Sequence, residues 1–80
     1  MIDIELRLFG NLRQYLEGIE LGKGYLMKLD DGSTIRVVIN SLGISTDIIK
    51  IILVNGRPKK LDDVLFDSDR LAIFPPIAGG

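Results

Sequence analysis

The chain contains no cysteine and no histidine among its 80 residues. Their absence excludes disulfide bonds, thiolate nucleophiles and imidazole bases, and it removes the usual protein ligands of zinc. We therefore expect no metal site and no bound cofactor. We also expect the chain not to be an enzyme by itself, because the remaining residues offer no constellation of acid, base and nucleophile.

The chain also lacks an excess of either charge and any long hydrophobic run. Ten Lys and Arg residues face eleven Asp and Glu residues, for a net charge of −1, and they are spread along the sequence. Without a basic face to neutralise phosphates, nucleic-acid binding is not expected. No run approaches the roughly 18 apolar residues of a membrane span, and MIDIELRLFG at the start resembles no signal peptide. These features predict a cytoplasmic protein without a membrane partner.

What the chain does contain is a large apolar fraction. Its 80 residues form one domain, with 46% hydrophobic residues and a mean hydropathy of +0.28. Such a chain is more apolar than a self-sufficient monomer of this length requires. We therefore expect part of its surface to face a partner.

The spacing of apolar residues predicts a sheet. Strands are expected where aliphatic residues alternate with charged ones or run continuously, at residues 2–8, 25–29, 51–54 and 70–74. Within 25–29, one face is expected to carry Tyr25, Met27 and Leu29, which makes an antiparallel pair with the first strand the expected arrangement. Asn55-Gly56 is a strong hairpin signal, and Pro58 places the short return arm at a sheet edge.

One helix is predicted between the second and third strands. Its apolar stripe has the spacing i, i+3, i+4 and i+7 and consists of Ile35, Val38, Ile39 and Leu42. Ser33 or Thr34 can cap the first turn, and Gly43 is well placed to end the helix. The helix contains poor helix formers, so packing on the sheet must stabilise it.

Two compact turns are also predicted. Residues 11–16 form a turn or short helical piece above Leu12 and Leu16, and residues 61–69 form a turn pinned by Leu65 and Phe66. The second turn contains an acidic cluster of Asp62, Asp63, Asp67 and Asp69. We interpret these aspartates as turn formers and caps, not as calcium ligands.

The chain ends in FPPIAGG, residues 74–80. Pro75 and Pro76 stiffen the chain and end the last strand, whereas Gly79 and Gly80 give the tip maximal freedom and no side chain. A stiff stem that carries a slender tip is suited to reaching into another protein.

The order of elements, VNG at 54–56, Asp69 before RLAIF, FGNLRQ after the first strand and above all FPPIAGG resemble the small subunit of molybdopterin synthase. That subunit belongs to the ubiquitin-like sulfur carriers, which include the thiamine-pathway carrier. The resemblance implies an α+β, ubiquitin-like β-grasp fold: a mixed sheet of four to five strands, one main helix and a free carboxyl-terminal tail. Residues 1–75 would be the domain and 76–80 the flexible tail. Ser68 departs from the family, which commonly has glycine there.

The resemblance also implies a role for the tail. An activating enzyme related to ubiquitin activators would use ATP to adenylate Gly80, and a sulfur donor would convert it to a thiocarboxylate. The large subunit, in a heterotetramer of two small and two large subunits, would spend that sulfur on the dithiolene of molybdopterin. In this view Gly79 supplies clearance, and the part that docks is Phe74, Pro75, Pro76, Ile77 and Ala78.

Two alternatives remain open. A carrier could deliver its sulfur to thiamine or to a tRNA base, or it could be conjugated to lysines of other proteins. The chain could instead be a non-catalytic binding module that uses its apolar sheet face and never activates its terminus. Only the second alternative predicts that removal of Gly79 and Gly80 has no effect.

Overall fold

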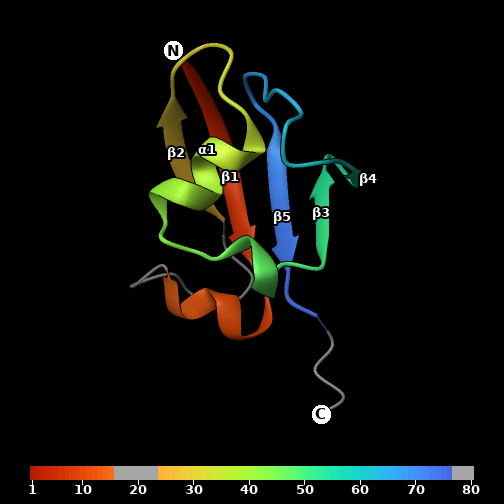
Figure 1. Ribbon diagram of the computed structural model, residues 1–80. Helices are drawn as coiled ribbons and strands as arrows, with labels where there is room; N and C mark the ends of the chain where they lie inside the picture. Colours follow the sequence, from red (N-terminus) through yellow and green to blue (C-terminus); the bar gives the residue numbers. More distant parts are fainter. Residues whose placement is uncertain (16–23, 77–80) are drawn as a thin grey trace.

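The computed structural model describes residues 1–15 and 24–76, and it contains a mixed five-stranded sheet with one helix packed on it (Figure 1). The elements, in chain order, are β1 (Ile2–Leu8), the 3-10 helix η1 (Gly10–Tyr15), β2 (Tyr25–Leu29), α1 (Ile35–Ser41), the 3-10 helix η2 (Thr46–Ile48), β3 (Ile51–Val54), β4 (Arg57–Pro58) and β5 (Arg70–Phe74). This is the predicted α+β, ubiquitin-like β-grasp fold. None of the helices in the described ranges has the length and apolar composition needed to cross a membrane.

The strands lie in the order β2-β1-β5-β3-β4. β1 and β5 pair in parallel at the centre of the sheet, and the other pairs are antiparallel. The register sets Leu8 of β1 opposite Ile73 of β5. Because parallel strands end at the same edge, β1 and β5 both deliver the chain to one end of the molecule.

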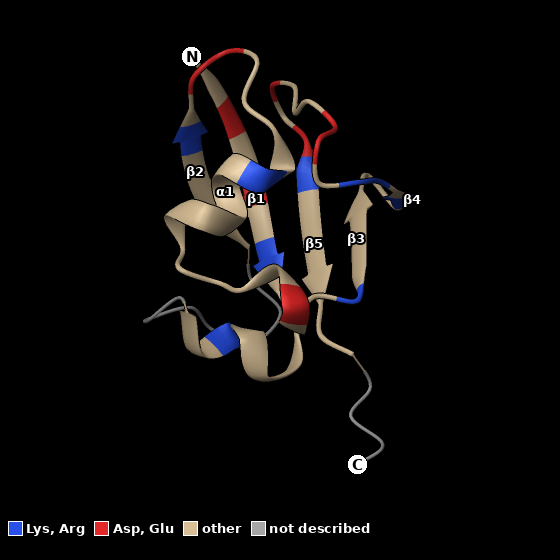
Figure 2. Ribbon diagram, viewed as in Figure 1, with Lys and Arg blue, Asp and Glu red and all other residues tan. Residues whose placement is uncertain are grey.

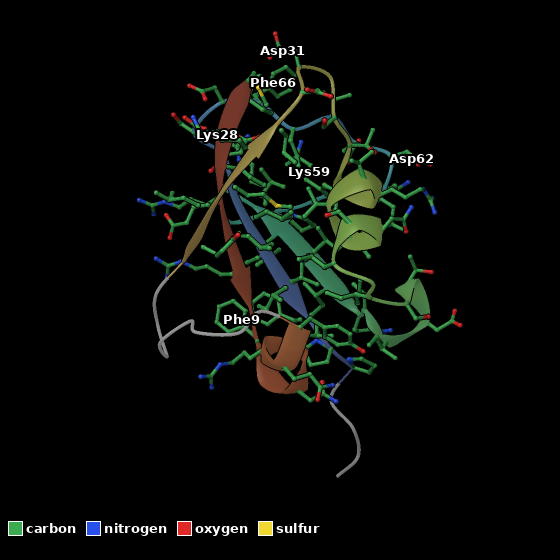
Figure 3. The ribbon with its side chains drawn as sticks, turned by 90° about the vertical axis from the view of Figure 1, so that its left-hand side faces the viewer. Phe9, Lys28, Asp31, Lys59, Asp62 and Phe66 are labelled. Carbon is green, nitrogen blue, oxygen red and sulfur yellow. The ribbon has the colours of Figure 1, made fainter. Side chains whose placement is uncertain are left out.

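Alternation along the strands separates a buried face from an open one. The core consists of Ile4, Leu6, Leu8, Leu12, Leu29, Ile35, Val38, Ile39, Ile44, Ile52, Val54, Leu65, Leu71 and Ile73. In the view turned by 90°, α1 covers one side of the sheet (Figure 3). The predicted face of β2 is confirmed, because Tyr25, Met27 and Leu29 lie opposite Leu6, Ile4 and Ile2.

The helix begins and ends as its sequence predicts. Thr34 is the N-cap, and its hydroxyl oxygen accepts a hydrogen bond from the Val37 amide at 3.4 Å. The hydroxyl of Ser33 instead donates to the carbonyl of Asp30. Gly43 follows the helix with a φ of +74°, which is the left-handed conformation that glycine accepts readily. Leu42 is half-buried against the core.

The turns contain one error of prediction. Leu12 is buried under η1 as expected, and the prediction for Leu16 lies outside the described residues. Leu65 is 1% exposed, but Phe66, predicted to pin the same turn, is 67% exposed. The Leu65 amide donates to the Ser33 carbonyl at 2.8 Å and holds Leu65 toward the core, so its neighbour is left outside.

The acidic cluster serves the backbone, as interpreted from the sequence. Carboxylate oxygens of three aspartates accept hydrogen bonds from amides: Asp63 from Lys60, Asp67 from Asp3, and Asp69 from Phe66, each at 2.8 Å. Among the residues that the structure describes, no group of three or more Asp and Glu side chains is arranged to hold a metal ion. These carboxylates therefore shape the turn.

Candidate functional site

The candidate site is the segment that leaves the end of β5, here called the stem: Phe74, Pro75 and Pro76. The Phe74 carbonyl accepts a hydrogen bond from the Lys50 amide at 2.9 Å, which is the last backbone bond at this end of β5. Pro75 and Pro76 have no N–H group and cannot extend the strand. Phe74 and Pro75 are half-buried, and Pro76 is exposed. The stem therefore departs from the sheet directly after Phe74.

An aromatic pair holds the base of the stem. The rings of Phe9 and Phe74 are stacked, with centroids 4.4 Å apart and planes 9° apart. The contact follows from the parallel pairing, since Leu8 lies opposite Ile73 and the next residue on each strand lies alongside the other. The Phe9 amide also donates to the Ile73 carbonyl at 3.1 Å.

A glycine supports the next residue of the stem. Gly10 has a φ of +58°, and a Cβ atom placed on it would lie 2.8 Å from Cγ of Pro75. That distance is shorter than a normal contact between carbon atoms. Gly10 is therefore required on two grounds, its left-handed backbone and the close approach of the proline ring.

The support is itself anchored in the core. η1 begins at Gly10, and its Leu12 is completely buried. The Leu12 amide donates to the Phe9 carbonyl at 3.2 Å, which ties the turn to the end of β1. Phe9, Gly10 and the buried Leu12 thus form a platform for the stem at the lower end of the molecule (Figures 1 and 3).

The open sheet face continues from the platform. Ile51, which is 46% exposed, lies opposite Phe74 in the pairing of β3 with β5. Beyond it, a shallow hollow of about 430 Å³ is lined by Arg7, Leu53, Asn55, Gly56, Arg70 and Ala72. Glu5 pairs with Arg7 at 2.7 Å and lies 3.9 Å from Arg70. The face next to the stem is therefore apolar near Phe74 and carries paired charges farther along β1 and β5.

Sequence reasoning found part of this site. It identified Phe74, Pro75 and Pro76, which the structure places together at the end of β5. The predictions for Ile77, Ala78, Gly79 and Gly80 lie outside the described residues. It missed Phe9 and Gly10 as the support of the stem. Their signal is the glycine that follows directly on the alternating residues of the first strand, after an aromatic residue in an outward-facing position.

The fold and the clamped stem define a ubiquitin-like protein. Its sequence matches the Mut7-C ubiquitin family over residues 1–78. The chain belongs to the Mut7-C ubiquitin family. No curated protein matches it significantly.

Solved structures with the same fold cover nearly the whole chain. One is a protein described as putative molybdopterin converting factor, subunit 1, from Pyrococcus furiosus, with 24% identity and a TM-score of 0.74 over 96% of this chain and 100% of that one. Another is small archaeal modifier protein 1 of Haloferax volcanii, with 22% identity, a TM-score of 0.74 and the same coverage, 96% and 100%. A third is found in a complex of subunits 1 and 2 of the molybdopterin-converting factor from Helicobacter pylori, with 22% identity, a TM-score of 0.61 and coverage of 99% and 100%.

Proposed function

We propose that this protein is a sulfur carrier that acts as the small subunit of a molybdopterin synthase. The observation that carries the proposal is the stem: Phe74 and Pro75 are clamped by Phe9 and Gly10 immediately before the sequence IAGG. A fixed base before a tip without bulky side chains suits a carboxylate that must enter the active sites of two other proteins.

The proposed chemistry takes place at the α-carboxylate of Gly80, when that carboxylate is free. Its oxygen attacks the α-phosphorus of ATP in an activating enzyme, and pyrophosphate leaves as the acyl-adenylate forms. A persulfide donor then attacks the acyl carbon and AMP leaves. A thiol reduces the resulting acyl disulfide, which gives the thiocarboxylate. All acids and bases for these steps come from the partner enzymes.

The residue types of the tail support this role. Glycine has no Cβ, so Gly79 and Gly80 need only a narrow channel, and activation of an achiral residue cannot racemise it. Ordering a flexible residue costs roughly 1 to 2 kcal/mol, and prolines reduce the cost for the stem before a partner is met. The structure-supported clamp at Phe74 and Pro75 reduces it further.

The proposed receiving partner is a large subunit that accepts the tail and uses its sulfur to build the dithiolene of molybdopterin. The likeness to the Helicobacter pylori protein, which is found with its second subunit, supports a partner of this kind. The apolar surface of Phe9, Phe74 and Ile51 beside the stem is available for the contact, since Phe9 is 37% and Ile51 46% exposed.

A second candidate function is protein modification, favoured by the likeness to small archaeal modifier protein 1. Activation would be the same, but a lysine amine would attack the activated carbonyl and form an isopeptide bond. Carriers for thiamine or tRNA thiolation would likewise share the activation step. The receiving partner therefore decides among these functions.

ATP–pyrophosphate exchange tests the shared activation step. The full chain and a variant lacking Gly80 are each incubated with ubiquitin-activator-like enzymes, ATP and labelled pyrophosphate. We expect exchange with the full chain and none with the shortened variant, although both fold alike. A non-catalytic binding module would support no exchange in either form and would bind its partner equally well after the deletion.

A further inference from the structure

A second surface lies away from the stem, between the β3–β4 hairpin and the turn at residues 61–69. It encloses a pocket of about 430 Å³, here called the basic pocket. Its floor includes Ile35 and Val54, its apolar rim is Val64 and Phe66, and its cations are Arg57 and Lys59. In Figure 3, Phe66 is labelled at the opposite end of the molecule from Phe9, the support of the stem.

The apolar rim of the basic pocket is unusually exposed. Phe66 is 67% exposed and Val64 44% exposed. A phenylalanine held so far out of the core gains nothing for folding from its ring. Exposed aromatic residues that line a pocket are instead typical of the central contacts of protein interfaces.

Phe66 is held outside by a bonded turn. Its amide donates to a carboxylate oxygen of Asp69 at 2.8 Å, and the Asp69 amide donates to the Phe66 carbonyl at 3.1 Å. The Ser68 amide donates to the Asp3 carbonyl of β1 at 2.7 Å. These bonds fix the turn before a partner arrives, which lowers the cost of ordering it on binding.

The free charge of the basic pocket is positive. Within the described residues, neither Arg57 nor Lys59 forms an ion pair, and Figure 2 shows the cluster of basic residues at β4. The pocket's two carboxylates are already engaged: Asp63 accepts from the Lys60 amide, and Asp69 accepts from Asn55 and Phe66. The two cations are therefore the groups that remain for a ligand.

We propose that the basic pocket docks an acidic segment of a partner protein. An aliphatic or aromatic side chain of the segment packs between Val64 and Phe66, and flanking Asp or Glu carboxylates pair with Arg57 and Lys59. The site suits separate carboxylates better than a nucleic-acid backbone, because the exposed Asp62 and Asp67 of the same turn would repel a continuous row of phosphates.

This docking is distinct from the proposed tail chemistry. The stem leaves the end of β5, whereas the basic pocket lies beyond the start of β5, where residues 61–69 enter the strand (Figure 1). A partner can therefore hold the basic pocket while another protein accepts the tail. The two proposals fail in different experiments, since deletion of Gly80 leaves the basic pocket unchanged.

A phage-displayed random peptide library, selected on the full chain, tests the proposal. We expect enriched peptides in which acidic residues flank an aliphatic or aromatic residue. Their Kd, measured with synthetic peptides, rises about tenfold or more on Phe66→Ser and on the double change Arg57→Gln with Lys59→Gln. Matched controls are Leu26→Ser, another exposed apolar residue, and Lys28→Gln, another exposed cation, which leave the Kd unchanged.

Several outcomes would overturn the proposal. One is a selection that enriches no peptide, or only neutral and basic ones. Another is a set of enriched peptides that bind the Phe66→Ser variant as tightly as the original chain while its folded spectrum is retained. Displacement of the peptides by a short single-stranded oligonucleotide would assign the surface to nucleic acid, and a dimer that Phe66→Ser dissolves would assign it to a second copy.

Discussion

The ring of Phe9 lies parallel to the ring of Phe74, with centroids 4.4 Å apart. Phe9 follows β1 and Phe74 ends β5, so the pair joins the two central strands at the point where both leave the sheet. Because Phe74 is also the first residue of the stem, this pair determines where the tail begins.

We expect the two rings to be energetically coupled. A double-mutant cycle with Phe9→Leu and Phe74→Leu, measured by urea unfolding, should give a coupling energy of about 0.5–1.5 kcal/mol. The control cycle combines Phe9→Leu with Phe66→Leu, whose effects should add because Phe66 lies at the other end of the molecule (Figure 3). Additive effects in both cycles would show that the stack does not stabilise the stem.

Gly10→Ala should be more destabilising than Gly43→Ala. Both glycines have positive φ, +58° and +74°, so alanine costs about 1–2 kcal/mol of backbone strain at each. Only at Gly10 does the new Cβ meet another group, Cγ of Pro75 at 2.8 Å, whereas nothing lies within 4 Å at Gly43. We expect an extra loss of about 1 kcal/mol at Gly10.

Thermal unfolding of the two variants measures that difference, and NMR shifts of Phe74 and Pro75 report its place. The stem signals should move in Gly10→Ala and remain in Gly43→Ala. Equal destabilisation with unmoved stem signals would contradict the close contact between Gly10 and Pro75.

Ser68→Gly should stabilise the protein. Ser68 has a φ of +70°, where glycine is free of strain, and the gain after the entropy of the unfolded glycine is about 0.5–1 kcal/mol. Asn55 provides the contrast, since its φ is +53° but its side chain bonds Asp69 and the Arg70 amide at 2.9 and 3.0 Å.

Asn55→Gly should therefore destabilise the protein by about 1 kcal/mol, through the loss of those two bonds. Urea midpoints of the two variants check the opposite signs. A loss of stability in Ser68→Gly would mean that its hydroxyl makes a contact more valuable than the strain that it imposes.

The Asp62 carboxylate should titrate below its ordinary value. The hydrogen bond from Arg36 at 3.0 Å, and then its positive charge, lower the pKa of Asp62 from 3.8. A pKa lowered by folding stabilises the folded state above pH 3.8, and this contribution is lost as the pH falls through the lowered value. The effect is modest and screened by salt, because the pair is exposed.

NMR titration of the Asp62 carboxyl carbon measures this pKa directly. Arg36→Gln should return it toward 3.8, and added sodium chloride should do the same in the unmodified chain. Lys28→Gln, which removes a cation paired with Asp3, should leave the Asp62 titration in place. An unchanged pKa in Arg36→Gln would exclude Arg36 as its cause.

Local pattern was sufficient for most of the fold. The alternation in residues 2–8 identified β1, the stripe of Ile35, Val38 and Ile39 identified α1, and Asn55-Gly56 identified the tight hairpin. Each of these signals depends on neighbours in the sequence, where sterics and burial act directly.

Contacts between distant segments were beyond such reasoning. Leu65 and Phe66 are adjacent and both apolar, and only the bond from Leu65 to Ser33 decides which of them enters the core. The platform of Phe9 and Gly10 depends on the parallel pairing of β1 with β5, which no local pattern indicates. The roles predicted for Gly79 and Gly80 stay predictions.

The central claim, that Gly80 carries sulfur, is tested most directly by the intact mass of the protein. The chain is incubated with ATP, a ubiquitin-activator-like enzyme, a persulfide donor and a thiol reductant, with the Gly80-deleted variant in parallel. We predict a mass gain equal to the replacement of one oxygen by sulfur, absent from the variant and from the reaction without ATP. An unchanged mass with every activating enzyme that binds the chain would contradict the account.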